Sequence, residues 1–178
     1  SSDLTGDGKL LYTTSADSRH ISNILVNDKY VFFTKSNADG TYYGIYKETA
    51  KGAGKAVRIT GAKCSAGGEL NIWAATAGKL YFSLAAPSNG QQRVYACDIA
   101  TGRNTRIATD RYVEARNSRY LYLSAYADNY ILHVYDMREG KYVWHPKKAD
   151  EVDTVSKIFL KSDRLYVVLE NQQNTGDF

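Results

Sequence analysis

Three histidines, His20, His133 and His145, have the widest chemical range of any side chains in this sequence. Histidine can ligate zinc or act as a general acid or base, but a zinc site needs several ligands that converge on one point. Each histidine falls at a different place in the repeated strand pattern described below, so we expect the three to lie apart. The sequence therefore predicts no metal site.

Sequence patterns of familiar catalytic sites are also missing, since the chain has no GxSxG, HExxH or P-loop pattern. Two glycine-rich turns, Gly6-Asp7-Gly8 and Gly52-Ala53-Gly54, could be mistaken for phosphate-binding loops. Each joins two predicted strands rather than opening a helix, so both are better explained as hairpin turns. The segment DLTGDG, from Asp3, lacks the acidic ligands and closing Glu of a calcium loop. We predict no catalytic residue and no cofactor.

The two cysteines, Cys64 and Cys97, lie too far apart in sequence for a CxxC metal or redox site. Two cysteines do not make a disulfide framework. A single bridge fits an exported protein, and two buried free thiols fit the same sequence equally well.

Composition indicates a folded β-protein. Of the 178 residues 43% are hydrophobic and 24% charged, which is ordinary for a globular chain, and 15 are tyrosines, which favour pleated, half-buried surfaces. The net charge of +4 is spread over scattered Lys and Arg residues, so we expect no nucleic-acid partner. No apolar run is long enough to span a membrane as a helix. Because the chain begins at Ser1, we expect a processed or trimmed protein or a piece of a longer one.

Short β-rich runs separated by turn residues recur along the whole chain, and no window keeps helical periodicity. After a short N-terminal strand within residues 1–15, the predicted strands are 20–26, 30–34, 42–47, 56–60, 70–75, 79–84, 93–98, 105–108, 112–116, 120–125, 131–136, 141–144, 155–160 and 165–170.

These strands form an imperfect repeat that is clearest between Leu70 and Thr109. One anchor of the repeat is a turn followed by an aromatic-aliphatic strand, as in NDKYVFF, AGKLYFS, NSRYLYL and SDRLYVV. This alignment places four basic residues in one column: Lys29, Lys79, Arg119 and Arg164. The other anchor is an acidic residue four positions before a glycine, in the pairs Glu48 and Gly52, Asp98 and Gly102, and Asp136 and Gly140.

Repeats of about 40 to 50 residues with four strands each are typical of β-propeller blades. We therefore predict an all-β fold of four-stranded antiparallel blades in a single domain, or propeller fragment, over residues 1–178. The N-terminal segment matches the end of a third strand plus a fourth strand, and the C-terminal part supplies only a first and a second. The predicted blades are 20–60, 69–109, 111–146, and 154–171 completed by 1–15.

The motifs GKLYFS, RVYACDIATGRNTRI, SRYLYLS and HVYDMREGKYVW resemble bacterial β-propellers of the TolB and YWTD-like superfamily. Within it, the chain is most similar to an uncharacterised family of propellers that resemble the low-density-lipoprotein-receptor-related protein. The YWTD tetrapeptide itself is absent. The resemblance implies export or display on the bacterial surface and a binding or scaffolding role. Six to eight blades are usual there, so the four counted here could close a ring, form part of a larger propeller, or join a second copy as a homodimer.

Aromatic residues of the second strand of each repeat are expected to pack between neighbouring blades. The first strands should instead line the central channel. Alternation places Asn71 and Trp73 opposite Leu70, Ile72 and Ala74. The same rule separates Tyr112, Glu114 and Arg116 from Val113 and Ala115, and exposes Lys157 beside Phe159. The predicted ligand-binding residues, which could otherwise only hold channel water, are Asn71, Trp73, Glu114, Arg116 and Lys157.

Three functions fit these observations. The first is a non-catalytic, extracytoplasmic module, secreted or on the cell surface, that binds a protein or a cell-wall polymer. The second is a lectin in which Trp73 and exposed tyrosines stack on sugar rings. The third is a propeller lyase or hydrolase that uses Glu114, Arg116 and Lys157, which requires these residues to meet across blades. We expect the first.

Overall fold

The computed structural model describes residues 20–50, 55–88, 90–124, 132–144, 153–161 and 164–171, with side chains described for all of these except 153–156 and 169–171. The segment 1–15, which we predicted to complete the fourth blade, lies outside these residues, as does His145.

The described chain is all-β, with fourteen strands in four antiparallel sheets. The first sheet contains β1 (His20–Val26), β2 (Tyr30–Ser36), β3 (Tyr42–Thr49) and β4 (Val57–Thr60). The second contains β5 (Glu69–Ala75), β6 (Lys79–Ala85), β7 (Gln92–Asp98) and β8 (Asn104–Thr109). The third contains β9 (Tyr112–Arg116), β10 (Tyr120–Ser124), β11 (His133–Asp136) and β12 (Lys141–Trp144). The fourth contains β13 (Asp153–Lys161) and β14 (Arg164–Asn171).

Each sheet pairs its strands in the order in which they occur in the sequence, which is the arrangement of a propeller blade. The predicted fold of four-stranded antiparallel blades is therefore confirmed, with a fourth blade of two strands in the described residues. Among the residues that the structure describes, no helix is long and apolar enough to cross a membrane.

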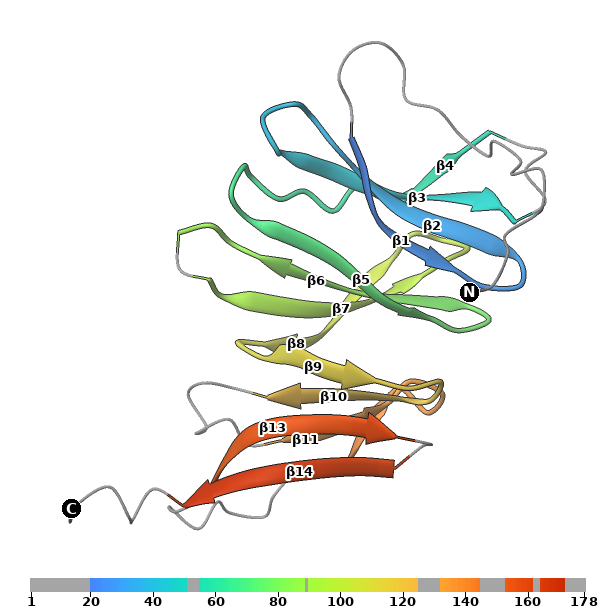
Figure 1. Cartoon of the computed structure of the whole chain (residues 1–178). Coiled ribbons are helices and arrows are strands. Elements are labelled where there is room, and N and C mark those ends of the chain that lie inside the picture. The colour runs from blue at the N-terminus through green and yellow to red at the C-terminus, as the bar shows by residue number, and fades with distance from the viewer. Residues whose placement is uncertain are drawn as a thin grey trace, which may run out of the picture.

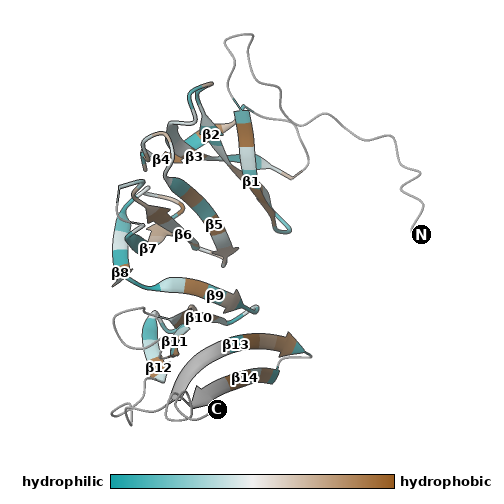
Figure 2. Cartoon of the chain, turned by 60° about the vertical axis from the view of Figure 1, so that its left-hand side comes forward, coloured by the Kyte–Doolittle hydropathy of each residue, from teal (hydrophilic) through white to brown (hydrophobic). Residues whose placement is uncertain are grey.

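The four sheets follow one another along the molecule, so that the first and fourth sheets lie at opposite ends (Figure 1). In the rotated view the first strands β1, β5, β9 and β13 run along one side, and the last strands β4, β8 and β12 along the other (Figure 2). The packing agrees, because β1 lies against β5, β5 against β9, and β9 against β13. The first strands thus lie side by side along one side of the molecule.

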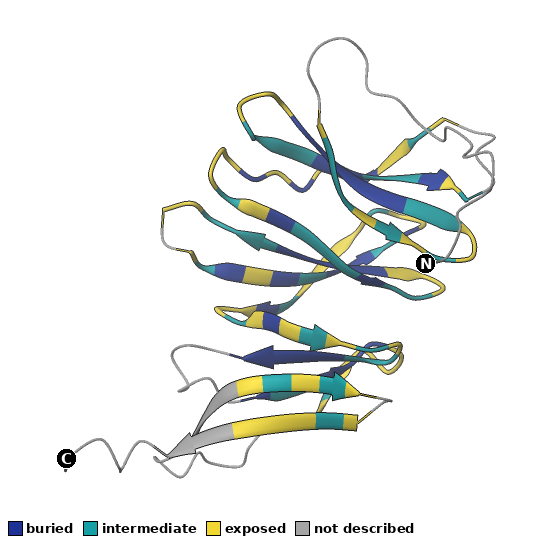
Figure 3. Cartoon of the chain, viewed as in Figure 1, coloured by how far each residue is buried: buried dark blue, intermediate teal, exposed yellow. Residues whose placement is uncertain are grey.

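Two hydrophobic cores hold the first three sheets together, and buried residues concentrate in the middle strands of these sheets (Figure 3). The core between the first and second sheets includes Phe32, Ile45, Leu70 and Phe82. The core between the second and third sheets includes Tyr81, Val94, Leu121, Leu123 and Tyr135. The second-strand aromatics therefore pack between blades, as the sequence predicts.

Hydrogen bonds in the first hairpin of each blade show how the repeats align. The backbone N–H of Asn27 donates to the Tyr30 carbonyl (3.0 Å), Thr76 to Lys79 (2.8 Å), and Asn117 to Tyr120 (3.0 Å). Lys79 is thus equivalent to Tyr30 and Tyr120. Arg164 occupies the same position in the fourth sheet, because it pairs with Lys161 directly across the β13–β14 turn. The single basic column that we predicted is wrong by one position, since Lys29 and Arg119 precede this column. An exposed turn accepts a basic side chain at either position, whereas the hydrogen-bonded Asn or Thr sets the register.

With this register, one column of second-strand side chains faces the next blade. Its first three members are Phe32, Tyr81 and Tyr122, with exposed fractions of 0%, 0% and 5%. The fourth is Tyr166, which is 48% exposed. The same position is therefore buried in the three sheets that have a following sheet, and exposed in the sheet that has none among the described residues.

In the second and third sheets the acidic column closes the hairpin between the third and fourth strands. The prediction that Glu48 belongs to this column is wrong by one position, because Thr49 pairs with Tyr30 as Asp98 pairs with Lys79 and Asp136 with Tyr120. The Asp98 carboxylate accepts hydrogen bonds from the backbone N–H groups of Ala100 and Thr101, and Asp136 accepts them from Arg138 and Glu139. The glycine of each pair has positive φ and donates its N–H to the Asp backbone carbonyl at 2.8 Å. Glycine is needed in this conformation because a Cβ atom would be strained. Gly52, of the first pair, lies outside the described residues.

Both carboxyl groups have a lowered pKa. Hydrogen bonds from the backbone and side chain of Thr101 hold the pKa of Asp98 below its usual range. Burial raises the pKa of Asp136, but hydrogen bonds from Glu139, Arg119 and Arg138 outweigh burial and lower it. The Arg119 guanidinium contributes through Nε, 2.6 Å from Oδ2.

These two shifts predict a loss of stability in acid. A carboxyl whose pKa is lower in the folded state stabilises the fold above its unfolded pKa, and this contribution disappears as the pH falls through the folded pKa. We therefore expect the free energy of unfolding to drop below about pH 4. Urea unfolding of the D98N variant should show a weaker dependence on acid pH than the parent. Asp28→Asn, in the exposed β1–β2 turn, is the control, and equal pH dependence in all three proteins would contradict the assignment.

Candidate functional site

A β-bulge interrupts the first strand of every sheet. The register shifts between Ser22 and Leu25 in β1, between Ile72 and Ala74 in β5, between Val113 and Ala115 in β9, and between Val155 and Lys157 in β13. A bulge places an extra residue in one strand and turns its side chain in a new direction. The residues at the second and third bulges are Trp73 and Glu114, two of the predicted ligand-binding residues.

Buried hydroxyl groups of the second strands anchor these bulges. Ser83 Oγ accepts a hydrogen bond from Trp73 Nε1 at 2.9 Å, and Ser124 Oγ donates to the Glu114 carboxylate. In the first sheet Thr34 donates to the Ser22 carbonyl at 2.9 Å. Thr34, Ser83 and Ser124 occupy the same position of the repeat and are all buried. Each blade of the first three therefore uses one hydroxyl to hold its first strand in the bulged conformation.

The bulges correct the strict alternation that we predicted for the first strands. Ala74 does not share a face with Leu70 and Ile72, because the bulge at Trp73 turns it into the core between the second and third sheets. In β9 the bulge at Glu114 likewise places Val113 opposite Leu123 and Ala115 opposite Tyr122, so the two residues face opposite sides of the sheet. One inserted residue reverses the facing of every later position in the strand.

A cleft of about 430 Å³ opens between the second and third sheets beside these bulges. Its lining combines two aromatic rings, two carboxylates and two amides around Val113. The residues that line it are Glu69, Asn71, Trp73, Gln92, Tyr112, Val113 and Glu114. The strands β5, β7 and β9 supply all seven, so the cleft is a product of blade stacking rather than of one loop.

Hydrogen bonds hold several of these side chains in place. Asn71 Nδ2 donates to Glu69 Oε2 at 3.1 Å, and the Gln92 amide oxygen accepts the backbone N–H of Val113 at 3.3 Å. The Tyr112 hydroxyl donates to the Gly90 carbonyl at 3.3 Å. Gln92 is buried, whereas Tyr112 and Glu114 are exposed. The cleft therefore offers a preformed polar floor with accessible groups at its mouth.

Three of the five predicted ligand-binding residues meet here: Asn71, Trp73 and Glu114. The other two, Arg116 and Lys157, are exposed on β9 and β13 and do not line the cleft. Sequence reasoning missed Glu69, Gln92 and Tyr112. Tyr112 lies on a first strand and could have been chosen for that reason, but Gln92 is on a third strand, and only the close approach of β7 to β9 brings it to the site.

The charge of the cleft is opposite to that of the whole chain. Among the residues that the structure describes, two carboxylates and no basic side chain line it, although the protein carries a net charge of +4. A polyanion that entered would meet uncompensated negative charge. The lining therefore favours a neutral or cationic ligand.

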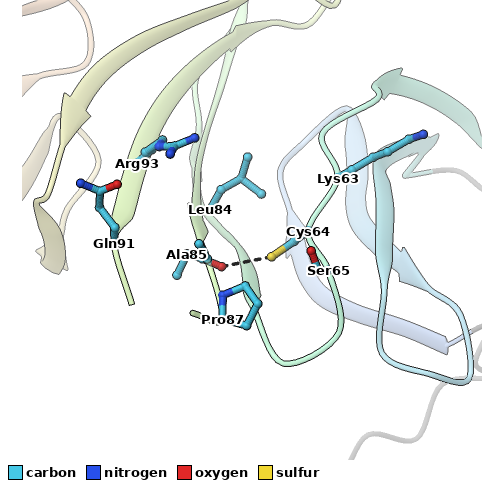
Figure 4. Close-up of a pocket in the computed structure, with 9 residues that line it drawn as sticks. Lys63, Cys64, Ser65, Leu84, Ala85, Pro87, Gln91 and Arg93 are labelled. Carbon is cyan, nitrogen blue, oxygen red and sulfur yellow. Dashed lines mark hydrogen bonds between the residues drawn. The ribbon is translucent and has the colours of Figure 1, made fainter. Parts of the chain in front are cut away.

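A smaller cleft of about 130 Å³ lies between the first two sheets, and its lining includes Cys64, Leu84, Ala85, Pro87 and Arg93 (Figure 4). The Cys64 thiol donates a hydrogen bond to the Ala85 carbonyl at 3.1 Å and is buried. Burial, followed by the nearby Glu69 charge, raises the pKa of this thiol. A protonated, hydrogen-bonded thiol is a poor nucleophile, so the contact is structural.

Both cysteines are buried free thiols, so of the two alternatives left open by the sequence, the free form is present. Burial raises the pKa of Cys97 to about 11, with a further contribution from Asp98. In the part of the chain that the structure describes, no three His, Cys, Asp or Glu residues are grouped to hold a metal ion. His20 opens β1 and His133 opens β11, in different sheets.

Comparisons with known proteins place no family name on the chain. No protein-family model matches the sequence, and no curated protein matches it either. A solved structure that is similar to this chain is an oligogalacturonate lyase in complex with manganese, with 14% sequence identity and a TM-score of 0.44. The match covers 75% of this chain and 38% of that one, so this chain spans well under half of its length. We draw no functional conclusion from a likeness at this level.

Proposed function

We propose that this protein is a non-catalytic binding module that takes its ligand in the cleft between the second and third blades. The observation that carries the proposal is the convergence of Asn71, Trp73 and Glu114, chosen from sequence, with Tyr112 and Gln92 in one preformed cleft. Binding sites combine apolar or aromatic surface with a few fixed polar groups, and this lining has both. The ligand is a protein segment or a cell-surface polymer, and the module acts outside the cytoplasm, in keeping with the TolB and YWTD-like resemblance.

A carbohydrate ligand is the second candidate, and the composition of the cleft favours it specifically. Trp73 and Tyr112 offer ring surface for the apolar face of a sugar, while Asn71, Glu69 and Glu114 offer hydrogen-bonding groups for its hydroxyls. Because the charged side chains that line the cleft in the described part of the chain are both carboxylates, we expect neutral saccharides to bind better than acidic ones. This charge also argues against nucleic acid as a partner.

The enzymatic alternative has less support. It needs Glu114, Arg116 and Lys157 to act together, and the latter two lie outside the cleft that contains Glu114. The Glu114 carboxylate is also engaged by Ser124, which gives it a structural task at the bulge. We therefore do not propose a lyase or hydrolase activity, but the binding experiment described next would also detect one.

Tryptophan fluorescence provides a direct test. The chain has two tryptophans, Trp73 in the cleft and Trp144, exposed at the end of β12, so the W144F variant reports on Trp73 alone. We expect neutral cell-wall oligosaccharides, or peptides from surface proteins, to change the emission of W144F in a saturable way. Adding Tyr112→Ala should weaken this binding roughly tenfold or more, the usual cost of removing a central aromatic contact.

Val143→Ala in the W144F background is the matched control, because Val143 is exposed on β12 away from the cleft. It should leave ligand affinity unchanged. If no neutral oligosaccharide or peptide alters Trp73 emission, the binding proposal is wrong. Release of a shorter product from any of these ligands, abolished by E114Q, would instead establish the enzymatic alternative.

A further inference from the structure

A cleft of about 490 Å³, which we call the basic cleft, lies at the β7–β8 hairpin end of the second sheet. In contrast to the Trp73 cleft, its described lining has no aromatic ring and combines two cations, one carboxylate and two hydroxyl groups. The residues that line it are Lys79, Ala96, Asp98, Thr101, Arg103 and Thr105. The two clefts share none of their described lining residues, so the basic cleft is a separate site.

Strand pairing places the basic cleft on the side of the second sheet that faces the third sheet. Tyr81 and Ala96 pair across β6 and β7, and both belong to the core between these two sheets. Lys79 and Asp98 are the next pair on the same side, because side chains alternate along a strand. The Lys79 ammonium reaches the third sheet, where a Cβ atom added to Gly140 would lie 3.5 Å from Nζ. The basic cleft therefore lies beside the hairpins of two neighbouring blades.

The third blade shows how an equivalent hairpin neutralises its basic side chains. Arg119 Nε lies 2.6 Å from Asp136 Oδ2, so the hairpin aspartate pairs with one cation. Glu139 lies 2.7 Å from Lys141 Nζ and 3.4 Å from the Arg119 guanidinium, so it pairs with both. Two carboxylates thus balance two cations in this blade.

The second blade lacks the second of these carboxylates. Thr101 occupies the position of Glu139, since the backbone N–H of each donates to the carboxylate of the hairpin aspartate. Arg103 occupies the position of Lys141, because each directly follows the hairpin glycine of positive φ. The repeat therefore keeps a basic residue at this hairpin and replaces the glutamate that would pair with it by a threonine.

The basic cleft consequently keeps a positive charge. Lys79 and Arg103 are exposed, and neither forms an ion pair with another residue that the structure describes. The Asp98 carboxylate is the acidic group of the described lining. Its Oδ1 accepts hydrogen bonds from the backbone N–H groups of Ala100 and Thr101 and from the Thr101 hydroxyl, which hold it in the turn. Two cations against one carboxylate in a concave site concentrate positive potential there.

We propose that the basic cleft binds an oxyanion, a phosphate monoester or a carboxylate, carried on a hydroxyl-rich group such as a sugar. A guanidinium such as that of Arg103 donates two parallel hydrogen bonds to an oxyanion, and the Lys79 ammonium adds a point charge. The exposed Thr105 hydroxyl can bond the hydroxyl groups of the carrier. The described lining offers no ring on which an aromatic acid would stack. The volume is that of a small-molecule site, so the carrier fits as well as the anion.

Isothermal titration calorimetry with glucose 6-phosphate and with glucuronate tests the proposal and shows which oxyanion fits. At least one of the two should bind saturably, with an affinity that falls as the salt concentration rises. Arg103→Gln removes the guanidinium and should weaken this binding roughly tenfold or more, the usual effect of losing a charged hydrogen bond. Thr101→Glu restores the carboxylate of the third blade and should weaken binding to a similar extent.

Two further variants are matched controls. Thr101→Gln has the size of Thr101→Glu without its charge and should leave the affinity unchanged. Arg106→Gln removes the same charge as Arg103→Gln, but Arg106 pairs with Tyr95 on the opposite side of the sheet from Ala96 and Thr105, so it should also leave the affinity unchanged. Failure of both anions to bind at millimolar concentration overturns the proposal. Equal losses in R103Q and R106Q overturn it as well, because they would indicate attraction by net charge alone.

Tyr112→Ala separates this site from the Trp73 cleft. Because the described linings of the two clefts do not overlap, Y112A should retain anion binding. Anion binding that is lost in Y112A and kept in R103Q would belong to the Trp73 cleft and would overturn the proposal. Thermal unfolding checks that each variant folds, and R103Q and T101E each carry the test if the other does not fold. The result does not depend on whether the Trp73 cleft binds a ligand.

Discussion

Replacing Tyr81 with alanine is expected to lower the free energy of unfolding by about 3–5 kcal/mol, the usual cost of truncating a buried aromatic side chain. Tyr81 is fully buried and joins the second blade to the third through its ring contact with Tyr135 and its hydrogen bond to the Met137 carbonyl. Burial, with smaller contributions from Tyr135 and Asp136, raises the pKa of Tyr81 to about 12, so the hydroxyl stays a donor at any ordinary pH. Urea unfolding measures the loss.

Two variants separate the contributions. Tyr81→Phe removes only the hydroxyl and should cost about 1–3 kcal/mol, because the buried Met137 carbonyl loses its partner. Tyr166→Ala makes the same truncation in the same column, but at an exposed position. It should cost less than about 1 kcal/mol. Equal losses for Y81A and Y166A would contradict the burial difference between the two positions.

Replacing Gly102 with alanine is expected to destabilise the chain by about 2–5 kcal/mol, the sum of backbone strain and overpacking. Gly102 has φ of +73° and donates its N–H to the Asp98 carbonyl, which closes the hairpin between β7 and β8. A Cβ atom here would run into the Ile59 carbonyl of the first sheet. The substitution therefore strains its own turn and also pushes two blades apart.

Gly140→Ala is the matched control, since it tests strain without the clash. Gly140 occupies the same position in the third blade and has φ of +70°, but a Cβ there would meet only Lys79 Nζ at 3.5 Å and the Tyr135 hydroxyl at 3.8 Å. We expect a cost of about 1–2 kcal/mol, from the left-handed conformation alone. Indistinguishable melting curves for G102A and G140A would show that the first and second sheets do not approach as closely as the structure indicates.

Local patterns were sufficient to predict the strands and the blade-like sheets. Turn residues such as Asn27, Asn117 and the Asp98–Gly102 pair mark hairpins through short-range hydrogen bonds, and these depend only on neighbouring residues. Aromatic residues such as Phe32, Tyr81 and Tyr122 recur where strands must be buried on both faces. A repeat predicts its own contacts, because each blade packs against a copy of itself.

The bulges could not be predicted, and they decide which side chains enter the candidate site. A short strand does not reveal a bulge, because one added residue leaves its composition unchanged. Strict alternation therefore misplaced the residues that follow the bulges, Ala74 in β5 and Ala115 in β9. In the first three sheets a sequence signal for the bulge is the hydroxyl column of Thr34, Ser83 and Ser124, which occupy the fifth position of the second strand. The one-position offset of the basic column could not be predicted either. A basic side chain in a turn needs only to be exposed, and either of two neighbouring positions meets that need.

The sequence by itself determined the all-β class, the four-stranded blades and the choice of Asn71, Trp73 and Glu114 as candidate ligand contacts, because these depend on turn chemistry and on which residues a first strand carries. Only the tertiary structure decided that Arg116 and Lys157 stay outside the cleft, and that Gln92 from a third strand joins it. It also decided that Tyr166 is exposed while Tyr81 is buried. Both outcomes depend on which sheet lies beside which, and stacking between blades is a long-range property that no single repeat encodes.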